Sequence, residues 1–303
     1  MNNAGPSIRG RIATMMVRAV VKHWPQNDHP ALVRRARRIF GSPKLSGLLQ
    51  QRGLRIEEVT SPVRGEWLSP PLPAFPDSVL LYLHGGGYIS CSPRSHRAIT
   101  ASLARMIGCR VFSLDYRLAP EHPFPAPVED AVAALQWLMA SGVKPENVAL
   151  AGDSAGGGLA LATLHSLREK GLPRPACAAC IAPLADMTGE HAFTNAASCA
   201  MFSPVDGRAF AEIYLNGQSP KSQLASPLLG ELAGMPPLLI QVSNKELLFD
   251  DAFRFHDKAK AAGVDSRLHV YAGLPHVWHM FIGSVPEAAQ ALREIAEFVK
   301  EHV

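Results

Sequence analysis

Short apolar runs alternate along most of this chain with longer segments in which apolar residues recur at helical spacing. From about Leu54 onward this alternation predicts a largely parallel sheet that helices cover on both faces. The predicted strands lie at residues 55–59, 79–83, 111–114, 148–152, 176–181, 238–242 and 266–270. The predicted helices lie at 95–107, 128–139, 155–170, 251–262 and 286–301, with a helix-containing insert at 186–217. The pattern therefore indicates an α/β fold built on one sheet.

Two further amphipathic helices are predicted in the first 50 residues. The apolar positions of the first are Ile12, Met15, Met16, Ala19 and Val20, and those of the second are Leu32, Ala36, Ile39 and Phe40. We expect these positions to pack inward while the neighbouring arginines face water. Such helices can lie against something other than the main core, which makes them candidates for a lid.

The composition is that of a globular protein with a sizeable core. Of the 303 residues, 47% are apolar and 18% are charged. No apolar run is long enough for a membrane-spanning helix, and the N-terminal residues do not resemble a secretory signal. The five cysteines are an odd number, and Cys177 and Cys180 lie in an apolar run, where we expect them to be buried. A reducing, cytoplasmic compartment fits this cysteine usage best.

Charge is distributed unevenly along the chain. Residues 1–55 contain eleven Lys or Arg residues and a single acidic residue, Asp28. A transit peptide would be similarly basic, but this segment is poor in serine and has the apolar spacing of folded helices. A nucleic-acid-binding arm would need stacking or base-reading groups, which the segment does not offer, so we expect no nucleic-acid partner.

The sequence Gly152-Asp153-Ser154-Ala155-Gly156 follows an apolar run and precedes a helix-forming segment. This strand, turn and helix order is the context of a nucleophile elbow, in which the turn presents a serine hydroxyl near the start of the helix. A side chain at Gly152 or Gly156 would crowd the elements on either side of the tight turn. Ser154 is therefore the candidate nucleophile.

Three consecutive glycines follow the predicted strand at 79–83, in the sequence His84-Gly85-Gly86-Gly87. Because glycine has no side chain, such a loop can bring backbone N–H groups close to a carbonyl oxygen and stabilise the charge that develops on it. We expect Gly86 and Gly87 to form this oxyanion hole, with the N–H of Ala155 as a third donor. His84 precedes the donors and is expected to hold the loop in place.

A serine nucleophile needs a base and an orienting acid, which follow it in this chain order in such folds. His276 lies on the loop after the last predicted strand, and His279 lies three residues further, so His276 is the preferred base. Glu246 is nearest to the end of the strand at 238–242 and is the preferred acid. Asp250 and Asp251 remain alternatives, although both fit the first turn of the next helix.

Five motifs between Val79 and Phe281 resemble the hormone-sensitive lipase-like family of α/β-hydrolases, the bacterial family IV esterases. The resemblance implies an α/β-hydrolase fold with a mostly parallel eight-stranded sheet, flanking helices and a helical cap. The motifs are His84-Gly85-Gly86-Gly87, the segment from Asp115 to Ala126, Gly152-Asp153-Ser154-Ala155-Gly156-Gly157, Ala225-Ser226-Pro227-Leu228 and Pro236-Pro237-Leu238-Leu239-Ile240.

Two departures from the family pattern concern the acid and the base. Where the family has Asp-Pro-Leu-x-Asp, this chain has Glu246-Leu247-Leu248-Phe249-Asp250, so the resemblance places a glutamate in the acid role. Where the family has His-Gly-Phe, this chain has His276-Val277-Trp278, which favours His276 over His279. The segment from Tyr116 to Pro125, although it holds Arg117, Glu121 and His122, is interpreted as a structural loop beside the oxyanion segment.

The resemblance also implies how the chain is divided. Residues 1–50 form an N-terminal helical cap segment, residues 51–303 form the catalytic domain, and residues 186–217 are a second cap insert. Apolar side chains of both cap parts are candidates for lining an acyl pocket: Met15, Met16, Trp24, Met201, Phe202, Phe210 and Tyr214.

These residues predict a serine carboxylesterase that works through an acyl-enzyme and requires no cofactor or metal. The resemblance, with its cap, implies acyl esters of short to medium chain length as substrates. The alternatives are another acyl-transfer hydrolase, such as an amidase or deacetylase, and a ligand-binding pseudoenzyme, against which His276 argues. The expected partner is a small ester substrate. We expect no stable membrane insertion, and a homodimer is possible.

Overall fold

The computed structural model describes residues 5–22, 24–25, 27–43, 45–190 and 193–303. Within them, eight strands form one sheet in the order β1-β2-β4-β3-β5-β6-β7-β8. Strand β2 pairs antiparallel with β1 and with β4, and all other neighbouring strands are parallel. The mostly parallel sheet that was expected is thereby confirmed. The strands are β1 (Arg55–Val59), β2 (Gly65–Ser69), β3 (Val79–Leu83), β4 (Arg110–Leu114), β5 (Val148–Asp153), β6 (Cys177–Ile181), β7 (Leu238–Ser243) and β8 (Ser266–Tyr271).

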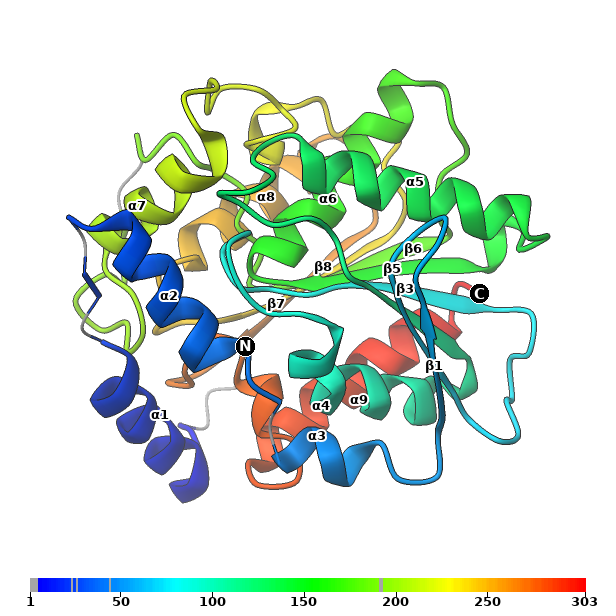
Figure 1. Ribbon diagram of the computed structural model, residues 1–303, viewed down its shortest axis with the longest axis horizontal. Helices are drawn as coiled ribbons and strands as arrows, with labels where there is room; N and C mark the ends of the chain where they lie inside the picture. Colours follow the sequence, from blue (N-terminus) through cyan, green and yellow to red (C-terminus); the bar gives the residue numbers. More distant parts are fainter. Residues whose placement is uncertain (1–4, 23, 26, 44, 191–192) are drawn as a thin grey trace.

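Helices cover both faces of this sheet (Figure 1). Helices α4 and α9 lie on one face and α5, α6 and α8 on the other, while α1, α2 and α7 gather at one end of the molecule. The α-helices are α1 (Ile8–Val21), α2 (His29–Phe40), α3 (Leu45–Gln50), α4 (Pro93–Leu103), α5 (Ala126–Ala140), α6 (Ala155–Glu169), α7 (Pro204–Leu215), α8 (Phe249–Ala261) and α9 (Pro286–Lys300). A π-turn, η1 (Ala104–Gly108), extends α4, and short 3₁₀ turns are η2 (Pro145–Asn147), η3 (Pro227–Leu229) and η4 (Trp278–Phe281).

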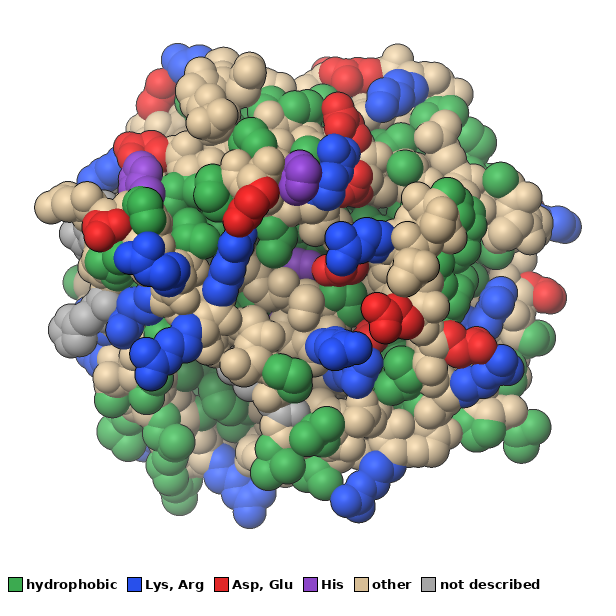
Figure 2. All heavy atoms as spheres, in the orientation of Figure 1, with side chains coloured by type: hydrophobic (Ala, Val, Ile, Leu, Met, Phe, Trp, Pro, Cys, Tyr) green, Lys and Arg blue, Asp and Glu red, His purple; other side chains and the backbone are tan. Residues whose placement is uncertain are grey.

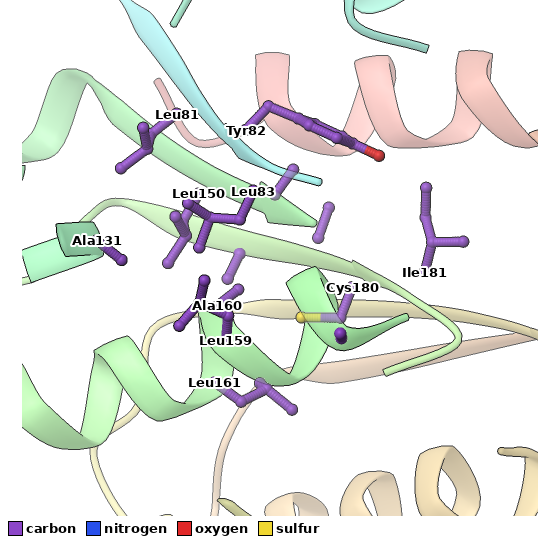
Figure 3. Packing of buried hydrophobic residues seen from close by; sticks show 14 of the residues in the cluster. Leu81, Tyr82, Leu83, Ala131, Leu150, Leu159, Ala160, Leu161, Cys180 and Ile181 are labelled. Carbon is purple, nitrogen blue, oxygen red and sulfur yellow. The ribbon is translucent and has the colours of Figure 1, made fainter. Parts of the chain in front are cut away.

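The central strands are buried on both faces, as their uninterrupted apolar sequences require. Figure 3 shows Leu83 of β3 and Leu150 of β5 pointing toward Leu159 and Ala160 of α6. Cys180 lies in the same core on β6, and burial raises the pKa of its thiol to about 12. The interpretation of Cys177 and Cys180 as small core residues is confirmed, because Cys177 is equally buried.

The sequence pattern missed strand β2 and helix α3. Strand β2 lacks a recognisable apolar pattern because it contains the charged residue Glu66, which is buried. Arg97 of α4 neutralises its carboxylate through hydrogen bonds of 2.6 and 2.9 Å. Beside it, Trp67 packs against Phe112 of β4 with ring centroids 4.9 Å apart. A buried ion pair of this kind depends on a partner from another element, which a local sequence pattern does not contain.

Helix α1 packs with a different face from the one predicted. Its buried side chains are Ala13, Val17 and Val21, with Gly10 in close contact with Leu274. The five positions expected to face inward, Ile12, Met15, Met16, Ala19 and Val20, are exposed instead. The helix is apolar on two opposite faces, and spacing alone does not indicate which of them packs. Helix α2 does pack as predicted, with Leu32 and Ala36 buried.

Specific contacts fix α1 to the rest of the molecule. The hydroxyl of Ser7 accepts the N–H of Gly10 at 3.0 Å, which caps the helix and explains why it begins at Ile8. Ser7 also donates two hydrogen bonds to the carboxylate of Glu287 at the start of α9. The hydroxyl of Thr14 donates to the carbonyl of Gly273 at 3.2 Å. These contacts hold α1 in one orientation, so a single face of the helix is turned to solvent.

Candidate active site

Ser154 occupies a sharp turn between β5 and α6. Its backbone has φ 55° and ψ −121°. Residues other than glycine rarely adopt this conformation, but a nucleophile elbow imposes it. A Cβ atom at Gly156 would collide with the carbonyl oxygen of Leu83, and one at Gly152 would collide with the carbonyl of Gly156. The two glycines are therefore needed for the close approach of strand and helix, as the sequence indicated.

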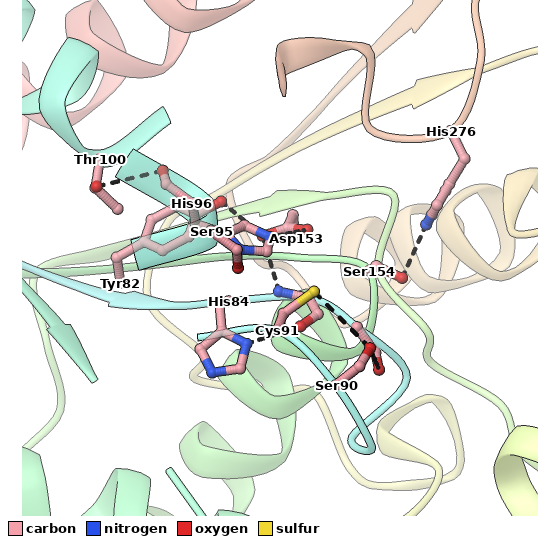
Figure 4. Close-up of polar contacts among 12 residues, drawn as sticks. Tyr82, His84, Ser90, Cys91, Ser95, His96, Thr100, Asp153, Ser154 and His276 are labelled. Carbon is pink, nitrogen blue, oxygen red and sulfur yellow. Dashed lines mark hydrogen bonds and ion pairs between the residues drawn. The ribbon is translucent and has the colours of Figure 1, made fainter. Parts of the chain in front are cut away.

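The structure brings Ser154, His276 and Glu246 together from three separate segments. The Oγ of Ser154 lies 2.8 Å from Nε2 of His276 (Figure 4). On the other side of the ring, Nδ1 is hydrogen bonded to Oε2 of Glu246, whose second oxygen accepts the N–H of Ser243 at 2.7 Å. Glu246 is fully buried and His276 nearly so. With Nδ1 protonated toward the carboxylate, Nε2 is free to accept the serine proton.

The alternative acids and base have other partners. Asp250 accepts two hydrogen bonds from Thr194, and Asp251 accepts the N–H groups of Ala185 and Asp186. Both aspartates stand in the first turn of α8. His279 is buried with Nε2 2.8 Å from Oε1 of Gln241, and burial lowers its pKa to about 3. These three side chains are thus engaged in holding the fold around the site.

The glycine loop after β3 exposes its backbone toward Ser154. Gly86 and Gly87 have positive φ angles of 113° and 64°, which glycine adopts at little cost. A Cβ atom at Gly87 would collide with the ring of Phe210. Both the positive φ angle and this lack of space therefore exclude a side chain at Gly87. Within the described part of the chain, no residue accepts a hydrogen bond from the N–H of Gly86 or Gly87. Ala155 is the first residue of α6, where N–H groups have no partner within the helix.

Asp153 joins this loop to the elbow, a role that the sequence analysis missed. Its Oδ1 accepts hydrogen bonds from the N–H of Gly85 at 3.0 Å and from the hydroxyl of Tyr82 at 2.7 Å. Its Oδ2 lies 3.3 Å from Nε2 of His96, and Figure 4 shows these groups converging on the carboxylate. Burial pushes the pKa of Asp153 upward, but His96 and Tyr82 outweigh this effect and hold the pKa below its ordinary value.

His84 holds the same loop from the opposite side. Its Nδ1 lies 2.7 Å from the carbonyl oxygen of Gly85, and its ring stacks on Tyr116 at 4.2 Å. The hydroxyl of Tyr116 donates to the carbonyl of His84 at 2.6 Å. Burial lowers the pKa of His84 to about 3, so the ring stays neutral. Both His84 and the segment that follows β4 therefore support the loop, as expected.

A pocket of about 400 Å³ opens beside Ser154. Met201, Phe202 and Phe210 line it, as the sequence suggested. Trp24 packs behind Phe202 and Phe210, with ring centroids 5.8 and 5.5 Å away, and Tyr214 is buried in a stack on Tyr88. The prediction for Met15 and Met16 is wrong, because α1 contributes its buried face instead. The remaining apolar lining residues are Val17, Val21, Ile39, Phe40, Leu184, Leu247, Leu248, Val277, Met280 and Phe281.

Neither a metal site nor a membrane-spanning helix is found among the described residues. No group of three or more His, Cys, Asp or Glu side chains is arranged to hold a metal ion. None of the described helices is long and apolar enough to cross a membrane.

Comparison with known proteins agrees with this geometry. Residues 80–280 match the family model described as the alpha/beta hydrolase fold. An acetyl-hydrolase of Streptomyces hygroscopicus is 45% identical over 238 residues, which are 78% of this chain and 79% of the relative. An esterase of Acinetobacter venetianus is 36% identical and aligns over 78% of each chain.

Among solved structures, an esterase from the bacterial hormone-sensitive lipase family superposes with a TM-score of 0.89 at 42% identity, covering 99% of both chains. The sheet order and the serine at the elbow are those of an α/β-hydrolase. The chain therefore belongs to the bacterial hormone-sensitive lipase family of α/β-hydrolases and is a carboxylic ester hydrolase.

Proposed function

We propose that Ser154, His276 and Glu246 form the catalytic triad of this esterase. The observation that carries the proposal is the continuous chain of hydrogen bonds from Oγ of Ser154 through the imidazole of His276 to the carboxylate of Glu246. His276 takes the proton of Ser154 as Oγ attacks the ester carbonyl. Glu246 holds the ring in the tautomer that accepts this proton and stabilises the imidazolium that forms.

The same groups then complete the reaction. His276 returns the proton to the departing alcohol as the carbon–oxygen bond of the ester breaks, which leaves an acyl group on Ser154. A water molecule, deprotonated by His276, attacks this acyl-enzyme. When the bond to Oγ breaks, Ser154 regains its proton from His276, and the carboxylic acid leaves.

We assign the oxyanion hole to the N–H groups of Gly86, Gly87 and Ala155. The positive φ angles of the two glycines and the position of Ala155 at the start of α6 support the assignment. All three belong to segments held by buried side chains, so little reorganisation is required when the oxyanion forms. Such donors contribute about 2.7–4 kcal/mol each to transition-state stabilisation.

The pocket supports a preference for acyl chains of short to medium length. Its volume of about 400 Å³ is limited by Phe202 and Phe210, and its walls are mostly apolar. The likeness to a protein named acetyl-hydrolase also favours a short acyl group. A long-chain triglyceride would need a larger or more open cavity.

We further propose that residues 1–50 and 186–217 form a cap over a catalytic domain of residues 51–303. Val17 and Val21 of α1, Phe40 of α2 and Phe210 of α7 contribute to the pocket from these two segments, which supports the division. Residues 1–4, 23, 26 and 44 of the first segment and 191–192 of the second lie outside the described residues.

A series of aryl esters with increasing acyl length tests the proposal. The wild type should hydrolyse short and medium esters. In Ser154→Ala and in His276→Ala kcat should fall about 10⁶-fold, to the residual activity that the oxyanion hole supports. Matched anilides and acetylated sugars distinguish an esterase from an amidase or deacetylase. Full activity of Ser154→Ala would refute the mechanism.

The compartment and the oligomeric state are separate proposals. None of the five cysteines, all of which lie among the described residues, forms a disulfide bond, and four of them are buried, which supports a reducing, cytoplasmic setting. Strand β8 ends the sheet, and none of the described strands pairs with its outer edge, which supports a homodimer through this edge. Light scattering in solution measures the mass that decides between monomer and dimer.

A further inference from the structure

Helix α1 presents an apolar stripe to solvent. Its members Ile8, Ile12, Met15 and Met16 recur at helical spacing on the side opposite to Val17, and each is between 46% and 76% exposed. Ala19 continues the stripe between them. The two methionines are flexible and polarisable, which suits contact with an irregular or fluid surface. Because the other face of α1 is already packed, this stripe is available for an external contact.

Cationic side chains flank the stripe on both sides. Arg11 and Arg18 of the helix and Lys22 at its C-cap lie along one border, Arg9 lies along the other, and all four are exposed. Arg18 also donates to the carbonyl of Ser198 at 3.0 Å. The helix contains no acidic residue, and Asp28 is the single acid in residues 1–55. An apolar strip bordered by arginine and lysine is typical of a helix that lies in the headgroup region of a lipid bilayer.

A second apolar patch lies on the same side of the molecule. Leu45, Leu48 and Leu49 of α3 are about half exposed or more and share one helix face. Figure 2 shows hydrophobic side chains gathered over α1 and α3 along one edge of the molecule, with Lys and Arg side chains beside them. Met280 and Phe281 line the pocket together with Val17 of α1 and Ser46 of α3, and the hydroxyl of Ser46 donates to the carbonyl of Met280 at 3.4 Å.

We propose that α1 and α3 form a docking surface for the face of an anionic phospholipid bilayer. The stripe would enter the boundary between headgroups and acyl chains, and the flanking cations would pair with anionic headgroups. Helix α1 lies parallel to the surface in this arrangement and spans no part of the hydrocarbon core. The pocket would then face a layer in which apolar esters concentrate.

Charge distinguishes this occupant from a second copy of the chain. A symmetric dimer through α1 would place the same patch of both copies in contact. Arg11, Arg18 and Lys22 of one copy would then approach the equivalent cations of the other, with no acidic residue on the helix to compensate. Anionic headgroups neutralise these charges instead, so the lipid surface is the favoured occupant.

Vesicle sedimentation tests the proposal directly. The full chain should sediment with vesicles of phosphatidylglycerol but much less with vesicles of phosphatidylcholine, and salt at about 1 M should weaken the binding. Ile12→Glu combined with Met15→Glu should lower the partition coefficient at least about a hundredfold, because each of the two lost apolar side chains contributes a factor of about 10 or more. The matched control is Leu72→Glu combined with Phe253→Glu, two exposed apolar positions away from α1 and α3.

The outcomes separate this proposal from that of the catalytic triad. Both double variants should hydrolyse a soluble aryl ester as the wild type does, so a loss of vesicle binding with full activity supports the docking surface alone. Equal binding of Ile12→Glu/Met15→Glu and the wild type would overturn it. A wild-type dimer that dissociates in this variant, without vesicle binding, would overturn it as well and assign the stripe to a second copy.

Discussion

The Oδ1 of Asp153 accepts the backbone N–H of Gly85 at 3.0 Å, so the residue before the proposed nucleophile holds the loop that carries two of the three proposed oxyanion donors. The carboxylate is buried and is also bound by Tyr82 and His96. Nucleophile and donors therefore share one anchoring group, and a displacement of one relative to the other requires breaking hydrogen bonds to a buried charge. Such bonds are worth about 1.5–3 kcal/mol each.

Asp153→Asn should separate positioning from substrate binding. Asparagine can still accept one hydrogen bond from Gly85, but its amide group faces His96 without a negative charge. We expect kcat to fall about tenfold to a hundredfold, the cost of misplacing reacting groups by up to about 1 Å, while KM changes little. Steady-state kinetics on a short aryl ester provide both values. An unchanged kcat in a variant that is merely less stable would show that Asp153 has no positioning role.

Glu246→Gln should abolish most of the activity. Glutamine can present its amide N–H₂ to Nδ1 of His276, which favours the wrong tautomer and removes the charge that stabilises the imidazolium. The expected loss in kcat is about 10³- to 10⁴-fold. The matched control is Asp250→Asn, since Asp250 is bonded to Thr194 on the surface side of α8. A fully active Glu246→Gln alongside an inactive Asp250→Asn would reassign the acid.

Glu246 could be predicted from the sequence, whereas the role of Asp153 could not. Ser154, Glu246 and His276 stand just after predicted strands, so the common edge of a parallel sheet brings them together in any fold of this topology. The role of Asp153 depends on Tyr82 and His96, whose approach is fixed only by packing in three dimensions. The inward face of α1 could not be predicted either, because both of its faces are apolar.

Two buried neutral histidines should make the stability depend on pH. Burial lowers the folded-state pKa of His84 and His279 to about 3, whereas the unfolded chain binds these protons near 6.5. Above pH 6.5 neither state is protonated at these rings and they contribute no pH dependence. As the pH falls below 6.5 the unfolded state gains protons and the folded state does not, so the free energy of unfolding decreases.

At about pH 4.5 each of these histidines should lower the free energy of unfolding by up to about 3 kcal/mol. Thermal unfolding between pH 7.5 and 4.5 measures the effect. In His279→Gln the amide can keep a hydrogen bond to Gln241 but does not titrate, so Tm should fall less steeply with acid than in the wild type. Parallel Tm profiles for the two proteins would contradict the assignment of His279 as a buried neutral ring.

Cys91 should be the cysteine that alkylating reagents modify in the folded enzyme. It lines the pocket and is half-buried, whereas the other four cysteines are buried. Burial raises the pKa of Cys109 and Cys177 to about 12, which suppresses their reactive thiolates. Iodoacetamide should label Cys91 and inhibit the enzyme, because the adduct would occupy the pocket beside Gly86. Peptide mass analysis locates the label. If iodoacetamide inhibited Cys91→Ser as strongly as the wild type, labelling of Cys91 would not be the cause of the inhibition.

Gly207→Ala should shorten the preferred acyl chain and stabilise the protein at the same time. Gly207 lies in α7 and lines the pocket, and a Cβ atom there would meet Cδ2 of Leu247 at 3.4 Å, an ordinary van der Waals contact. The new methyl group thus fits, but it occupies space in the pocket. Alanine also favours a helix over glycine by about 1 kcal/mol, so Tm should rise.

The two effects of Gly207→Ala have separate causes and separate measurements. The added methyl group should lower kcat/KM for the longest accepted ester and leave that for an acetyl ester nearly unchanged, since only the longer chain reaches α7. Thermal unfolding without substrate reports the helix effect alone. A raised Tm with an unaltered chain-length profile would mean that acyl chains do not extend toward α7, and the proposed acyl pocket would have to be placed along its other walls, beside Leu184 and Phe281.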